Sequence, residues 1–140
     1  MKGLPGLIQL NQWKVDEQRR KVTELEVLSE RLADQVAQLQ NEIEREGRNS
    51  GESVEASMAY SAFLKAAMSQ RETLRGSIED MQQQISAAKD DLADAYRELK
   101  SYEVAQAARD SREARKQELR DRVKMDEIGM GMFRRKSGAA

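Results

Sequence analysis

The sequence predicts an all-α protein, an antiparallel two-helix coiled-coil hairpin with a longer second helix. Three observations predict this class: a seven-residue apolar repeat, a polar gap that contains glycine, and a second apolar run that outlasts the first. A strict period of 3.5 residues places a narrow apolar stripe along each helix, and such a stripe leaves water only by packing against another helix.

The first helix is predicted over residues 5–46. Pro5 is compatible with a first helical turn, where its missing N–H has no partner to lose. The apolar repeat then runs from Ile8 to Ile43. Its a positions are Ile8, Val15, Val22, Ser29, Val36 and Ile43, and its d positions are Asn11, Gln18, Leu25, Leu32, Leu39 and Glu46.

The gap predicts a turn over residues 47–53. Its seam positions Glu46, Ser50, Ser53 and Ser57 are polar, and Gly47 and Gly51 lie among them. Each glycine costs about 1 kcal/mol in a helix interior. One alternative remains, because the heptad frame continues across the gap as it would in a single helix of about 110 residues; that helix would pair as a long parallel dimer.

The second helix is predicted over residues 54–125, with Ser53 as its N-cap and Glu55 in its acidic first turn. Its repeat resumes beyond the gap. The a positions are Leu64, Arg71, Ile78, Ile85, Leu92 and Leu99, and the d positions are Tyr60, Ala67, Leu74, Met81, Ala88, Ala95 and Tyr102. Residues 1–125 therefore form one predicted coiled-coil hairpin, followed by a flexible C-terminal tail at 126–140.

A short turn predicts the antiparallel register in which paired residue numbers sum to 103. This places Val22 beside Met81, Leu25 beside Ile78 and Ile43 beside Tyr60. The second helix beyond Tyr102 then has no partner within the chain. The C-terminal end of the chain is positively charged, since residues 105–140 carry 10 basic and 6 acidic side chains. We expect this segment to fray or to become ordered on binding.

Composition excludes several kinds of chemistry. The 140 residues include no Cys and no His, so disulfides, the usual zinc sites and the commonest general base are absent. Asp90, Asp91 and Asp94 form a carboxylate cluster, but Asp91 points away from the other two, and a solvated face is favoured over a metal site. No active site or cofactor is predicted, and no signal peptide or membrane span is recognised.

The basic end is a weak candidate for nucleic-acid binding, because acidic residues alternate with basic ones and aromatic residues are missing between Tyr102 and Phe133. We expect no nucleic-acid partner. Met130, Met132 and Phe133 with the basic run after them predict at most peripheral membrane contact.

Phe63 and Trp13 are aromatic residues outside the seam. Phe63 lies at a g position near the turn, where a flank over the hairpin tip and a partner-binding patch are equally compatible with the pattern. Trp13 lies at an f position and points outward, with no role in the seam.

Several short motifs resemble the flagellar export protein FliJ family, especially its alphaproteobacterial members. They are Leu7-Ile8 with Leu10, the run Val15-Asp16-Glu17 followed by Arg19-Arg20, Tyr60 with Phe63, and Lys124-Met125-Asp126-Glu127 with a basic close. The similarity covers nearly the whole chain, in order and at similar spacing.

The resemblance implies a non-enzymatic stalk or coupling component, and general chaperone, of the flagellar type III export apparatus. It implies that the end carrying both termini binds the hexameric export ATPase FliI, that the helix after the turn contacts the export gate protein FlhA, and that export chaperones are further partners. The location it implies is cytoplasmic, at the cytoplasmic face of the flagellar base. The alternative is a self-associating structural coiled coil without an ATPase partner.

The partner-binding residues expected from the resemblance and the charge pattern form two groups. The gate-facing group follows the turn: Phe63, Ala67, Gln70 and Leu74. Phe63 matches the aromatic position of the family, whereas Ala67, Gln70 and Leu74 depart from its pattern. The ATPase-facing group lies in the basic end: Arg109, Arg112, Arg115, Lys116, Arg120, Phe133, Arg134 and Arg135.

Overall fold

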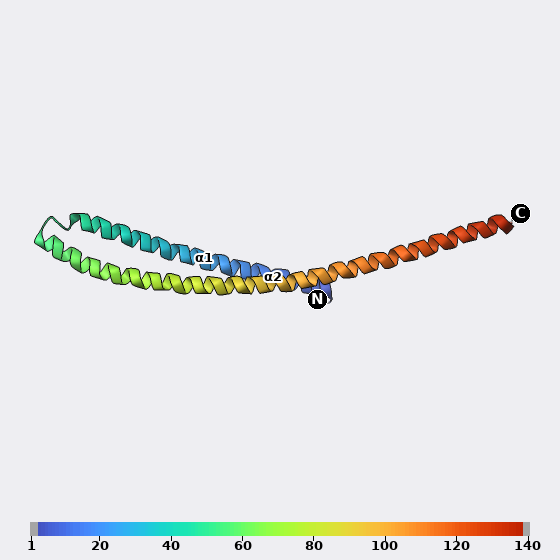
Figure 1. Cartoon of the computed structure of the whole chain (residues 1–140), viewed down its shortest axis with the longest axis horizontal. Helices are drawn as coiled ribbons and strands as arrows, with labels where there is room; N and C mark the ends of the chain where they lie inside the picture. The colour runs from blue at the N-terminus through green and yellow to red at the C-terminus, as the bar shows by residue number, and fades with distance from the viewer. Residues whose placement is uncertain (1–2, 139–140) are drawn as a thin grey trace. The chain divides into compact units, whose positions relative to one another are not determined.

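The structure is a computed structural model that describes residues 3–138. Helix α1 spans Leu4–Asn49 and helix α2 spans Val54–Gly138, and no strand occurs among the described residues. The two helices run antiparallel on either side of the turn (Figure 1). The predicted fold class, an all-α hairpin with a longer second helix, is confirmed.

Both helices extend beyond their predicted ends. Helix α1 continues through Gly47 to Asn49, and helix α2 continues from residue 126 to Gly138, where a flexible tail was expected. Gly129 and Gly131 lower helix propensity by only about 1 kcal/mol each. The basic residues Arg135 and Lys136 lie in the last turn, where positive charge interacts favourably with the helix dipole. The last two residues of the predicted tail lie outside the described range.

The turn is fixed by side-chain caps at both helix ends. The Ser50 hydroxyl donates to the Gly47 carbonyl at 2.8 Å, and the Ala56 N–H donates to Ser53 Oγ at 2.9 Å. Ser53 is therefore the N-cap of α2, as predicted. Gly47 has a second role, because a Cβ at this position would lie 3.2 Å from the Tyr60 hydroxyl. The absence of a side chain lets the Tyr60 ring approach α1.

The described chain divides into two units. The hairpin unit comprises residues 13–96, and the end unit comprises residues 1–12 and 97–140, of which residues 1–2 and 139–140 are not described. In the hairpin unit every predicted a and d position from Val15 to Ile43 and from Tyr60 to Ala95 is buried or half-buried. Leu39, Ile43 and Ala67 form a buried cluster near the turn. The heptad prediction of the seam is therefore confirmed.

The register within the hairpin unit differs from the predicted one. Arg19 lies over the ring of Tyr96, with 5.3 Å between the guanidinium carbon and the ring centroid. If paired numbers summed to 103, Tyr96 would lie about 18 Å along the axis from the residue facing Arg19, farther than the two side chains reach. The Val22–Met81 and Leu25–Ile78 pairs are therefore wrong.

The next register that still places a opposite d has paired numbers that sum to 110, one heptad along. Arg71 Nη1 donates to Gln40 Oε1 at 3.0 Å. Because 40 and 71 sum to 111, this bond fits the 110 register within one residue, or about 1.5 Å. Val22 then faces Ala88, and Ile43 faces Ala67. The prediction failed because heptad arithmetic repeats every seven residues, and the choice of the shortest turn does not decide the register.

In the end unit, the start of α1 packs on α2 as far as Gln106. Asn11 and Leu99 are buried, and Ile8, Tyr102 and Gln106 are half-buried. The unpaired part of α2 was predicted to begin after Tyr102; it begins four residues later. From residue 107 to Gly138 every residue is exposed except Gly131. We call residues 107–138 the overhang.

Candidate partner-binding surfaces

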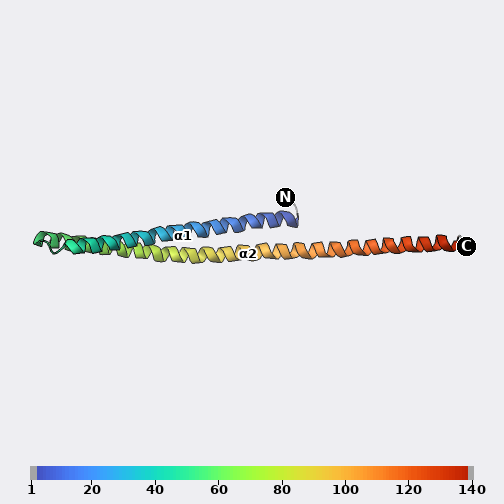
Figure 2. The same cartoon turned by 90° about the horizontal axis from the view of Figure 1, so that it is seen from above.

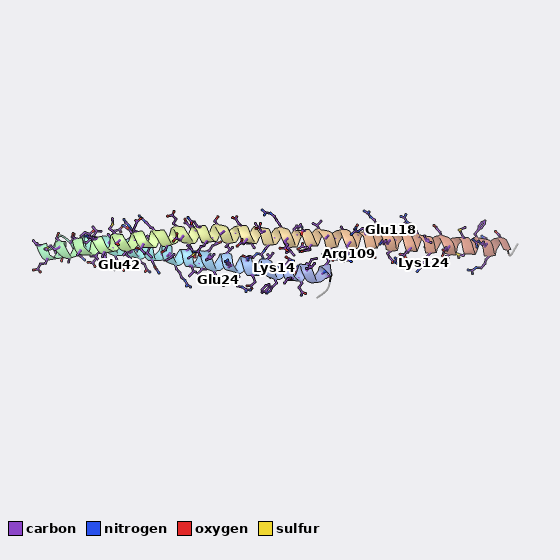
Figure 3. The ribbon with its side chains drawn as sticks, turned by 90° about the horizontal axis from the view of Figure 1, so that it is seen from below. Lys14, Glu24, Glu42, Arg109, Glu118 and Lys124 are labelled. Atoms are coloured by element: carbon purple, nitrogen blue, oxygen red, sulfur yellow. The ribbon has the colours of Figure 1, made fainter. Side chains whose placement is uncertain are left out.

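The overhang is a helix with no neighbouring segment of the chain among the described residues (Figure 2). It carries all ten basic and all six acidic side chains of residues 105–140. Arg109, Glu118 and Lys124 illustrate this arrangement, with side chains that extend away from α2 (Figure 3). A helix of this composition, exposed on every side, gains no stability from packing and presents its whole surface to other molecules.

All seven cations predicted to bind a partner lack an ion pair or side-chain hydrogen bond within residues 3–138. They are Arg109, Arg112, Arg115, Lys116, Arg120, Arg134 and Arg135. Three of the acidic residues do have partners. Gln106 bonds to Asp110 at 2.8 Å, Gln117 bonds to Asp121 at 3.2 Å, and Arg122 pairs with Glu118 at 3.0 Å. The ion pair removes one charge of each sign and the glutamine bonds leave the aspartates charged, so the overhang keeps the net positive charge of its composition.

Large apolar side chains also project from the overhang. Leu119 is 59% exposed and Phe133 is 71% exposed. Met125 and Ile128 are also exposed. The sequence pattern pointed to Met130, Met132 and Phe133 and left out Leu119 and Val123. Their spacing could have revealed them, because Val123 and Met130 continue the d positions while Leu119 and Phe133 continue the g positions.

These apolar residues occupy two sides of the helix. At about 100° per residue, one group lies within an arc of about 80° and the other within about 60° on roughly the opposite side. The first group is Leu119, Val123, Met130 and Phe133. The second group is Met125, Ile128 and Met132. We call these groups face A and face B. A single flat partner surface covers only one of them.

The gate-facing group predicted after the turn is only partly accessible. Ala67 is 3% exposed and packs with Leu39 and Ile43 in the hairpin core, so it is not available for a partner. Phe63 and Leu74 are half-buried against the same cluster, and Gln70 is exposed. Ala67 is buried at the d position of the seam that the heptad frame predicts for it, although the resemblance places it in the partner-binding group.

An open depression of about 440 Å³ adjoins Phe63 at the hairpin tip. The sequence analysis did not predict it. Its lining comes from both helices and the turn: Glu46, Asn49, Ser50, Ala56, Ala59, Tyr60 and Phe63. Nearby, Val54 and Met58 are strongly exposed. Phe63 therefore belongs both to the flank of the core and to an accessible surface, so the two alternatives for this residue are compatible.

Trp13 is 60% exposed, in keeping with its outward f position. Asp90, Asp91 and Asp94 are exposed on α2. Among residues 3–138, no group of three metal-ligating side chains converges. A search of the same residues found no helix both long and apolar enough to cross a membrane.

The fold and these surfaces define a class of protein: a helical hairpin whose accessible features are an unpaired basic helix and an apolar tip, suited to contacts with other proteins. The chain belongs to the FliJ family, because the family model described as "Flagellar FliJ protein" matches residues 1–138. The chain is thus a component of the flagellar type III export apparatus, in a family of structural and export components. No curated protein and no solved structure matched the chain.

Proposed function

We propose that this protein is a non-enzymatic coupling stalk and chaperone that links the hexameric export ATPase FliI to the export gate protein FlhA at the cytoplasmic face of the flagellar base. The overhang is the ATPase-binding element, and the hairpin tip is the gate-binding element. The observation that carries the proposal is the overhang, a basic helix with large apolar side chains that nothing in the described chain covers.

The distribution of apolar residues supports a partner that surrounds the overhang. Faces A and B together expose seven large apolar side chains over residues 119–133. Covering both faces requires contacts from at least two sides, as neighbouring subunits of a ring would provide. The cations between the two faces would meet acidic groups of such a partner. Exposed charge pairs of this kind are screened over about 8 Å at physiological ionic strength, so binding should weaken with salt.

The hairpin tip is proposed as the contact for the export gate. Phe63 and Gln70 are its accessible members, and the depression beside Phe63 offers room for an apolar side chain of the partner. Export chaperones would be further partners of the exposed helix surfaces. A self-associating structural coiled coil is the second candidate, favoured by the same uncovered apolar faces, because a second copy of the overhang could cover one of them.

The decisive experiment removes the overhang by ending the chain after Gln106. The hairpin seam ends at this residue, so the truncated protein should keep its helical fold and its unfolding temperature. We expect binding to the export ATPase to fall at least tenfold in a pull-down or sedimentation assay. A truncated protein that binds at full strength would refute the assignment, and a full-length protein that binds no ATPase but forms discrete homo-oligomers would favour the structural alternative.

Serine variants of face A and of face B test whether the partner contacts both sides of the overhang. One variant replaces Leu119, Val123, Met130 and Phe133, and the other replaces Met125, Ile128 and Met132. Both variants should weaken ATPase binding. If only one of them lost binding, the partner would contact only one side of the overhang. Leu28→Ser is the matched control, because Leu28 is an exposed apolar residue of α1.

Phe63→Ala tests the gate-binding element. It should impair binding to the gate protein and leave ATPase binding unchanged, with Lys65→Ala, an exposed neighbour, as its control. An equal loss of binding to the gate protein and to the ATPase would mean that the substitution disturbs the fold.

A further inference from the structure

The hairpin seam satisfies two registers equally well in its apolar layers. Nine seam positions of α1 lie between Val15 and Ile43. In the observed register, where paired numbers sum to 110, six of these nine positions form a pair in which both residues are apolar. In the register that sums to 103, six of the nine positions also form such a pair. The free energy gained by burying apolar side chains therefore differs little between the two registers.

Polar contacts distinguish the two registers. The bond from Arg71 to Gln40 and the stacking of Arg19 over Tyr96 both require the observed register. These contacts are few: the bond to Gln40 is part-buried, whereas Arg19 and Tyr96 are exposed. The seam also holds two buried polar atoms with no partner among the described residues, Gln18 Oε1 and Arg71 Nε. Both residues stay at seam positions opposite apolar residues in either register, so their unsatisfied atoms do not favour one register over the other.

The turn has a different form in each register. In the observed register, the residue of α2 level with Asn49 is residue 61, so the first two turns of α2 extend past the end of α1 (Figure 1). The four residues 50–53 span this offset. In the other register the two helix ends at the turn are level, and Tyr60, which lies half-buried beside Gly47 in the observed register, faces Ile43 instead. The depression at the tip, which Tyr60 lines, belongs to the observed register.

We infer that the hairpin exchanges between these two registers by sliding α1 along α2 by one heptad, about 10 Å. A partner that occupies the tip depression holds the observed register. Loss of that contact allows the slide, which places Tyr60 opposite Ile43 and removes the depression. Ligand binding at the tip thereby shifts a pre-existing equilibrium through its differential affinity for the two states. This inference needs no assumption about which protein binds the overhang.

Disulfide trapping tests the exchange, and the natural chain offers a clean background because it contains no cysteine. Val22→Cys with Ala88→Cys reports the observed register. Val22→Cys with Met81→Cys reports the shifted one. Val22→Cys with Gln83→Cys is the matched control, because Gln83 is exposed and faces away from the seam. Each variant is equilibrated at low concentration in a glutathione redox buffer, and intramolecular disulfides are quantified by peptide mapping.

We expect the Ala88 pair to form most disulfide and the Met81 pair to exceed the control at least tenfold. Adding Arg19→Ala and Gln40→Ala should shift the ratio several-fold towards the Met81 pair, because only the observed register loses contacts. A Met81 pair no higher than the control in either background would overturn the inference, as would equal crosslinking of all three pairs.

A second set of variants guards against a local packing defect. Ile43→Cys with Ala67→Cys reports the observed register, and Ile43→Cys with Tyr60→Cys the shifted one. Circular dichroism checks that each protein remains helical. In the protein locked by the Tyr60 pair, amide hydrogen exchange of residues 54–60 should slow relative to the Ala67-locked protein, because these residues gain a neighbour. Unchanged exchange would contradict the slide.

Discussion

The hairpin unit and the overhang use the same kinds of residue in opposite ways. In the hairpin unit, the leucine, valine and isoleucine residues at the heptad a and d positions are buried or half-buried along one seam. In the overhang, Leu119, Val123 and Ile128 are more than half exposed, although they lie on the same continuous helix α2. The difference is the presence of α1. It shows that an apolar side chain on this protein stabilises the fold only where a second helix covers it, and elsewhere is available for binding.

Truncating a seam leucine should have the largest effect on stability. Leu39→Ala removes a side chain from the buried cluster with Ile43 and Ala67, and we expect a loss of about 3 kcal/mol in the free energy of unfolding. Urea unfolding followed by circular dichroism measures this. Leu119→Ala in the overhang is the control and should change the value by less than about 0.5 kcal/mol. Similar effects at the two positions would remove the distinction between the regions.

Replacing the seam arginine should stabilise the hairpin. Arg71 places a charge among apolar neighbours, with a neutral amide and a methionine sulfur as its hydrogen-bond partners. Arg71→Leu removes the cost of withdrawing that charge from water and should raise the free energy of unfolding by about 1 kcal/mol. The matched overhang change, Arg120→Leu, removes a solvated charge and should leave stability unchanged. A destabilised Arg71→Leu protein would mean that the bond to Gln40 outweighs the desolvation cost.

Loss of the N-cap at the turn should cost about a third as much stability as loss of a seam leucine. Ser53→Ala removes the acceptor for the Ala56 N–H and should reduce stability by about 1 kcal/mol, measured by thermal unfolding. Ser53→Asp, which retains an acceptor, should recover most of this loss. Failure of aspartate to restore stability would argue against capping as the cause.

The smallest global effect is expected in the overhang. Gly129→Ala and Gly131→Ala favour helix by about 1 kcal/mol each, and no atom lies within 4 Å of the added Cβ at either position. Helical content measured by circular dichroism should rise, while the unfolding midpoint of the hairpin stays the same. A raised midpoint would show that the overhang and the hairpin unfold as one cooperative unit.

Much of the fold was predictable because the seam pattern is local and repetitive. Every a and d position of the hairpin unit from Val15 to Ile43 and from Tyr60 to Ala95 is buried or half-buried, including the polar seam residues Gln18 and Arg71. The register was not predictable, because the sequence fits two alignments equally and the decision rests on contacts such as Arg71 with Gln40. The end of α2 was misjudged for a related reason, since two glycines weaken a helix without ending it.

The candidate surfaces were predicted less completely than the fold. The cations predicted for the overhang are exposed, because no second helix among the described residues covers this part of α2. Ala67 stands in two predictions, the seam and the partner-binding group, and its burial agrees with the first. The tip depression depends on how far α2 extends past α1, which follows from the register and was therefore not accessible from the sequence.

The position of the buried cluster beside the turn has a consequence for folding order. Ile43 and Ala67 are 24 residues apart in the chain, so their contact closes at a lower entropic cost than the packing of the start of α1 near Leu99, which closes a loop of most of the chain. Folding should therefore start at the turn and proceed towards the termini. During synthesis α1 emerges first, and its apolar stripe stays exposed until Ala67 leaves the ribosome. For that interval the first helix depends on solubilising charges or on cellular chaperones to avoid aggregation.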